Sequence, residues 1–79
     1  MNNESTIRFN DTAFVSEVAR RMVVLRNQAG MSQHALSKRA GIPRSTIAMI
    51  ESGRQSATLV QVGRIASALE ISTLELIGT

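Results

Sequence analysis

Cysteine is absent from the 79-residue sequence, and histidine occurs only once, as His34. The chain therefore cannot form a disulfide, and it lacks the set of cysteine or histidine ligands that a metal centre needs. No apolar run approaches the roughly 18 residues of a membrane span. The polar N-terminus, MNNESTIRFND, also lacks the layout of a signal peptide. We expect a soluble cytoplasmic protein with no metal, no cofactor and no membrane contact.

Groups that carry out catalysis are missing as well. The sequence has no carboxylate pair on one predicted helix face and no glycine-rich phosphate loop. His34 has no orienting carboxylate beside it and no nucleophile to activate. We therefore expect no enzymatic activity and assign no catalytic residue.

The length and the charge distribution indicate one domain with a basic region. Seventy-nine residues with 43% hydrophobic content are typical of a single small folded domain. The formal net charge is only +3, but five basic residues and one acid, Glu51, lie between positions 38 and 64. Such an excess suits a polyanion such as DNA, although a solvated basic face would have the same composition. The basic residues are Lys38, Arg39, Arg44, Arg54 and Arg64.

Hydrophobic periodicity predicts an all-α fold of five helices in residues 12–79, preceded by an N-terminal arm of residues 1–11. The helices are expected at about residues 12–29, 33–40, 43–52, 59–69 and a short stretch after Ser72. Thr58 with Gln61, and Ser72 with Glu75, have the spacing of capping boxes. We expect Asp11 and Ser32 to cap the first two helices. The residues expected to face the core from the last two helices are Leu59, Val62, Ile65, Ala66, Leu69, Leu74 and Ile77.

The stretch SQHALSKRAGIPRSTIAMIESG, residues 32–53, has two short helices around Gly41, which is the layout of a helix-turn-helix. It resembles the phage-repressor family, the group of Cro, lambda repressor and Xre. The resemblance extends over residues 14–77 and implies a compact five-helix lambda-repressor-like DNA-binding domain. The matching positions are Gln33, Leu36, Ser37, Ala40, Gly41, Ile42, Thr46, Ile47, Ile50, Glu51 and Gly53. Pro43 departs from the serine or threonine common in the family.

The resemblance implies that the helix after Gly41 lies in the major groove. Its base-reading residues would be Arg44, Ser45, Ala48 and Met49, and Arg44 has a simple phosphate contact as its alternative role. The phosphate-contacting residues would be Ser32, Gln33, Thr46, Arg54, Gln55 and Ser56. Gln33 is also expected to brace the start of that helix. The alternative role of Thr46 is to pack near the turn. The alternative for Arg54, Gln55 and Ser56 is a solvated loop without DNA contact.

Arg26 and Glu51 are expected to form a structural ion pair. The resemblance pairs this glutamate with an arginine of the first helix. Arg26 follows Met22 by four residues, on the inward side of that helix. A charge placed there needs a partner.

These features predict a transcriptional regulator, foremost a repressor, in a prokaryote or phage and associated with the nucleoid. It would bind a pseudo-palindromic operator in double-stranded DNA as a homodimer, through the fifth helix and the C-terminal tail or through the N-terminal arm. One alternative is an antitoxin or another module that binds a protein partner as well as DNA. The other is the N-terminal DNA-binding part of a longer regulator.

Overall fold

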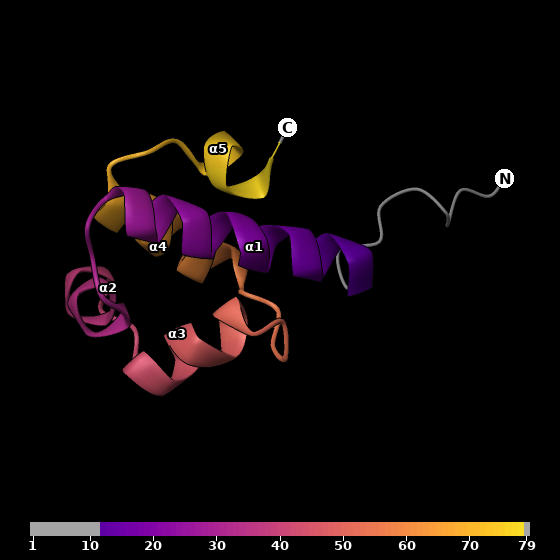
Figure 1. The fold of residues 1–79 in the computed structure, drawn as a ribbon, viewed down its shortest axis with the longest axis horizontal. Helices are drawn as coiled ribbons and strands as arrows, with labels where there is room; N and C mark the ends of the chain where they lie inside the picture. The colour runs from indigo at the N-terminus through magenta and orange to yellow at the C-terminus, as the bar shows by residue number, and fades with distance from the viewer. Residues whose placement is uncertain (1–11, 79) are drawn as a thin grey trace, which may run out of the picture.

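The computed structural model describes residues 12–78, which form five helices and contain no strand (Figure 1). The helices are α1 (Thr12–Gln28), α2 (Gln33–Ala40), α3 (Arg44–Glu51), α4 (Leu59–Leu69) and α5 (Thr73–Ile77). The predicted all-α class is therefore confirmed. The predicted N-terminal arm and the cap at Asp11 lie outside the described residues. None of the described helices combines the length and hydropathy needed to cross a bilayer.

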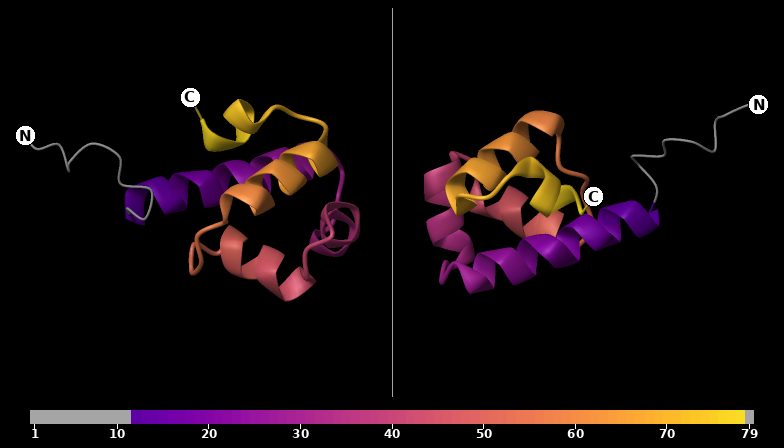
Figure 2. Two further views of the ribbon diagram at one scale, coloured as in Figure 1. Left: turned by 180° about the vertical axis from the view of Figure 1, so that it is seen from behind. Right: turned by 90° about the horizontal axis from the view of Figure 1, so that it is seen from above.

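The longest helix, α1, separates two parts of the domain. Figures 1 and 2 show α3 on one side of α1 and α5 on the other. The α2 helix packs against both α3 and α4, and α4 packs in turn against α5. This arrangement holds α3 between α1 and α2 and leaves its remaining surface open to solvent.

Each of the five helices contributes one fully buried side chain to the centre of the core. These residues have no more than 2% of their surface exposed, so they remove most of their apolar area from water. Deleting one would leave a cavity as well as lose transfer free energy. The five residues are Met22, Leu36, Ile47, Ile65 and Leu76.

The four helices whose N-cap is described, α2 to α5, share one pattern at their start. An apolar residue precedes the N-cap, and a second apolar residue occupies the fourth helical position, five residues later. Both residues pack in or against the core cluster, as in a hydrophobic staple. The pairs are Met31 and Leu36, Ile42 and Ile47, Ala57 and Val62, and Ile71 and Leu76.

Two predicted core positions are wrong. Leu59 is 83% exposed and Leu74 is 58% exposed. Leu59 is the first residue of α4, and Leu74 is the second residue of α5. Side chains at these positions point away from the core, whereas the side chain at the fourth helical position enters it. Leu76, rather than Leu74, is the buried residue of α5.

The helix ends follow the predicted turn chemistry. Gly41 ends α2 with φ 68° and ψ 36°, a left-handed conformation that costs glycine no steric strain. Glu70 ends α4 in the same region, with φ 59° and ψ 42°. Glu70 is the only non-glycine residue with positive φ among the described residues. Both predicted capping boxes, at Thr58 and at Ser72, are confirmed.

Candidate nucleic-acid interface

The helix-turn-helix consists of α2, the turn around Gly41 and α3. Ser32 has extended backbone angles, and its Oγ accepts a hydrogen bond from the backbone N–H of Ala35 at 3.0 Å. Gly41 and Ile42 both donate backbone hydrogen bonds to the carbonyl of Ser37, which closes the end of α2. The turn is therefore fixed by the backbone itself, and the direction in which α3 leaves it is defined.

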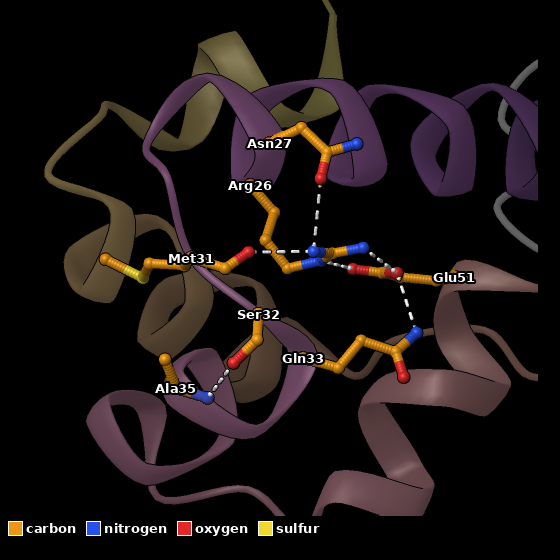
Figure 3. Close-up of polar contacts among 7 residues, drawn as sticks. All are labelled: Arg26, Asn27, Met31, Ser32, Gln33, Ala35 and Glu51. Atoms are coloured by element: carbon orange, nitrogen blue, oxygen red, sulfur yellow. Dashed lines mark hydrogen bonds and ion pairs between the residues drawn. The ribbon is translucent and has the colours of Figure 1, made fainter.

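An ion pair anchors the far end of α3 to α1. Arg26 Nε donates to Glu51 Oε2 at 2.6 Å, and Arg26 Nη2 donates to Glu51 Oε1 at 3.0 Å (Figure 3). The third guanidinium nitrogen, Nη1, donates to the carbonyl of Met31 at 2.8 Å and to Asn27 Oδ1 at 3.3 Å. The two charged side chains are only 12% and 5% exposed. Four of the five N–H groups of the guanidinium thus join α1, the α1–α2 turn and α3.

The hydrogen bonding of the Arg26 guanidinium to the Glu51 carboxylate, which accepts, raises the pKa of Arg26 above its ordinary value, against the opposing effect of burial. A group with a raised folded pKa stabilises the fold below its unfolded pKa and loses that contribution only as the pH rises through the folded value. Arg26 therefore contributes to stability throughout the neutral range.

Gln33 joins the same network from the start of α2. Its Nε2 donates to Glu51 Oε1 at 2.9 Å, while its Oε1 points away from the ion pair (Figure 3). The expectation that Gln33 braces the start of α3 is therefore wrong, because it contacts the last residue of α3. A primary amide carries two N–H groups, so one N–H remains after the bond to Glu51.

The surface of α3 divides into a buried and an exposed face. Ile47 and Ile50 are buried, whereas Arg44, Ser45 and Met49 are exposed. Ala48 and Thr46 are half-buried between these faces. The four residues predicted to read bases therefore lie on the exposed face of α3 or at the edge of that face.

The start of α3 has no side-chain cap. Pro43 is the N-cap rather than a first-turn residue, with φ −55° and ψ 143°, and its ring offers no hydrogen-bonding atom. The carbonyl of Pro43 accepts the backbone N–H groups of Thr46 and Ile47. The preceding N–H groups of the first turn have no intrahelical acceptor and point along the helix axis. This end of α3 therefore carries the partial positive charge of a helix N-terminus.

The loop after α3 carries the remaining predicted contact residues. Arg54 and Ser56 are exposed, and Gln55 is half-buried. Gln55 and Ser56 also line an apolar groove between α1 and α4. They therefore lie between this groove and the candidate nucleic-acid interface. Arg54 alone carries a charge on this loop.

The unpaired cations of the described chain include two at the candidate interface. Arg20, Arg21, Arg26 and Arg39 pair with carboxylates, and Arg64 Nη1 donates to the Gly41 carbonyl at 3.3 Å. Lys38, Arg44 and Arg54 have no ion pair within residues 12–78. Two guanidinium groups without an ion pair among residues 12–78 thus lie at α3, that of Arg44 at its start and that of Arg54 in the loop that follows it. The bond from Arg64 to the turn was not predicted, because no local sequence pattern links positions 23 residues apart.

The fold and the geometry of α2 and α3 define a helix-turn-helix protein. The chain belongs to the HTH_3 helix-turn-helix family, whose model matches residues 24–76, and the predicted resemblance to the phage-repressor group is confirmed. Two similar proteins, one from Methanothermobacter thermautotrophicus and one from Vibrio cholerae, are described as transcriptional regulators. The chain is thus a member of a family of helix-turn-helix regulators.

One similar protein is an uncharacterised HTH-type transcriptional regulator of Methanothermobacter thermautotrophicus, 43% identical over 44 residues. The match covers 56% of this chain and 64% of that protein. Among solved structures, the restriction-modification controller protein C.AhdI from Aeromonas hydrophila is 33% identical, with a TM-score of 0.79. That alignment covers 81% of this chain and 97% of C.AhdI. An HTH_3 family transcriptional regulator from Vibrio cholerae is 31% identical, also with a TM-score of 0.79, over 82% of this chain and 36% of the regulator.

Proposed function

We propose that this protein binds specific sequences of double-stranded DNA with α3 in the major groove and represses transcription. The observation that carries the proposal is the exposed face of α3, which presents Arg44, Ser45 and Met49 while Ile47 and Ile50 fix the helix to the core. An α-helix fits the major groove, and the N-terminal residues of a recognition helix reach the base edges there.

The side chains on this face suit different base edges. Arg44 can donate two hydrogen bonds to O6 and N7 of one guanine, which is a discriminating contact. The hydroxyl of Ser45 can donate or accept, so it fits several bases. Ala48 and Met49 offer apolar contact to a thymine methyl group. We assign base reading to these four residues, with Arg44 as the strongest determinant.

A second set of residues would bind the DNA backbone. Phosphate contacts fix the register of the protein on the duplex and carry no sequence information directly. The N–H of Gln33 that remains after its bond to Glu51 can donate to a phosphate, and the backbone N–H groups at the start of α2 favour an anion. The proposed set is Ser32, Gln33, Thr46, Arg54, Gln55 and Ser56.

We further propose that the chain, from a prokaryote or phage, acts as a homodimer on a pseudo-palindromic operator in the cytoplasm, bound to the nucleoid. A single small domain makes few contacts, and joining two of them raises the affinity steeply. Two-fold symmetry then requires half-sites about one helical turn apart, roughly 34 Å. A dimer bound over a promoter would block its use by the transcription machinery.

The test is binding-site selection from random duplexes, followed by titration of three single variants on the selected site at two salt concentrations. We expect Arg44→Ala to relax the preference at one base pair of each half-site, at a cost of about 1–3 kcal/mol. Arg54→Ala should weaken binding to all sequences alike and lower the salt slope by about one.

Arg20→Ala is the control of matched charge. Arg20 is an exposed residue of α1 that lines the groove between α1 and α5, on the side of α1 away from α3. This substitution should change neither the selected sequence nor the salt slope by a comparable amount. The proposal fails if no sequence is enriched, or if Arg20→Ala weakens binding as much as Arg44→Ala does.

A further inference from the structure

The excess positive charge of the sequence gathers around the turn between α2 and α3. Four of the nine basic residues and only one of the six acids lie there, so these five residues account for the whole formal net charge of +3. The last turn of α2 and the start of α3 supply three of them, and α4 with its C-cap supplies the other two. We call this group the turn cluster: Lys38, Arg39, Arg44, Arg64 and Glu70.

Two contacts connect α4 with the end of α2. Arg64 Nη1 donates to the Gly41 carbonyl at 3.3 Å, and Arg39 Nη2 donates to Glu70 Oε2 at 3.3 Å. A guanidinium carries five N–H groups, so most of those on Arg64 remain available after its bond to the turn. The side chains of Lys38 and Arg64 are exposed, and neither forms an ion pair among residues 12–78. The proposed DNA contacts use neither of these two cations.

The turn cluster lies at the opposite end of α3 from two of the proposed phosphate contacts. Gln33 donates to Glu51, the last residue of α3, and Arg54 follows in the exit loop (Figure 3). The turn instead leads into Arg44, the first residue of α3. Because α3 has eight residues, its two ends are about 12 Å apart.

This length matches the dimensions of the major groove. The groove is about 12 Å wide, and a phosphate backbone borders it on each side. A helix of that length, with one end held against phosphates, therefore has its other end close to a different set of phosphates. Duplex DNA carries one negative charge per about 1.7 Å of its axis, so exposed cations at that end have anions to neutralise.

We infer that Lys38 and Arg64 bind phosphates of the operator at the start of α3, apart from the phosphates bound at the end of that helix. The inference rests on the proposed function, because it requires α3 to lie in the major groove. The bond to the Gly41 carbonyl holds the Arg64 guanidinium at the turn before DNA binds. Less side-chain freedom is then lost when the contact forms.

Glu70 is the one acid of the turn cluster, and its removal provides a gain in binding as a test. Its carboxylate pairs with Arg39 and would repel a nearby phosphate. Glu70→Gln keeps the size of the side chain but removes its charge and frees Arg39. We expect DNA binding to tighten at least threefold and the salt slope to become steeper. Loss of folding cannot produce such an increase in affinity.

Titration of the full chain on its selected duplex, at several salt concentrations, measures the contribution of each cation. Lys38→Gln and Arg64→Gln should each weaken binding to all sequences at least fourfold and lower the salt slope by about one. Arg20→Gln is the matched control, since Arg20 is exposed on the side of α1 away from α3. Glu75→Gln, in the groove between α1 and α5, is the matched control for Glu70→Gln.

Ethylation interference identifies the phosphates. Ethylation removes the charge of one phosphate, so binding falls wherever the protein needs that charge. The wild type should be sensitive at two groups of phosphates in each half-site. Arg64→Gln should lose its sensitivity at one group and Arg54→Ala at the other; loss of the same phosphates in both variants would overturn the inference.

The outcomes distinguish this inference from the proposed function. A selective wild type whose Lys38→Gln and Arg64→Gln variants bind as Arg20→Gln does would overturn the inference alone. A Glu70→Gln variant that binds no more tightly than Glu75→Gln would do the same, because no phosphate then lies near the turn cluster. A wild type that enriches no sequence would overturn the proposed function, and this inference with it.

Discussion

The buried ion pair between Arg26 and Glu51 should contribute more to stability than any other charge contact in the described chain. Arg26→Met would leave the Glu51 carboxylate 5% exposed, with only the amide of Gln33 as a remaining partner. Removing one partner of a buried pair costs about 3–5 kcal/mol, because the other charge stays out of water. A chain of this length has a total stability of about 4–12 kcal/mol at 0.05–0.15 kcal/mol per residue. The substitution should therefore remove a large part of that stability.

Urea unfolding followed by far-ultraviolet circular dichroism measures this loss, and Arg39→Met is the control. Arg39 also pairs with a glutamate, Glu70, at 3.3 Å, but the two side chains are 52% and 78% exposed. Exposed pairs contribute about 0–1 kcal/mol. If Arg26→Met costs no more than Arg39→Met, the argument from burial is wrong. The double variant Arg26→Met/Glu51→Leu should be more stable than the sum of its single variants indicates, since no unpaired charge remains.

Two further predictions concern backbone angles and are checked by thermal unfolding. Glu70→Gly should raise the free energy of unfolding by about 0.5–1 kcal/mol, because glycine adopts the φ of 59° without strain; a lower melting temperature would show that the Arg39–Glu70 pair matters more than the strain. Gly63→Ala should also stabilise, by about 0.5–1 kcal/mol, because Gly63 is inside α4 and an added Cβ meets nothing within 4 Å. The same change at Gly41, where φ is 68°, should instead destabilise by about 1 kcal/mol or more; similar effects at the two glycines would contradict the account of the turn.

Sequence periodicity predicted the five helices and most of the core, because capping residues and glycines mark the helix ends chemically. It failed at Leu59 and Leu74, where an apolar stripe was extended into the first turn of a helix. The spacing of five residues between the apolar residue before the cap and the fourth helical residue would have assigned these positions correctly. Ile71 and Leu76, for instance, have that spacing and both pack in or against the core.

The candidate site was predictable in part. Arg26 and Glu51 could be paired from the resemblance and from the cost of leaving an inward charge alone. The bond of Gln33 to the end of α3 depends on how two helices cross, and the contact of Arg64 with the turn depends on how α4 packs on α2. Neither relation is encoded in local sequence. The exposure of Leu59 and Val60 also appeared only once the helices were assembled.

The central claim is that the exposed face of α3 and the start of α2 bind DNA. Nuclear magnetic resonance of the backbone amides during titration with the selected duplex tests it most directly. The account predicts that the largest shifts occur at Gln33, in the first turns of α3 and at Arg54, with little change in α5. Shifts concentrated along α5 and its contact with α1, with α3 unaffected, would contradict it.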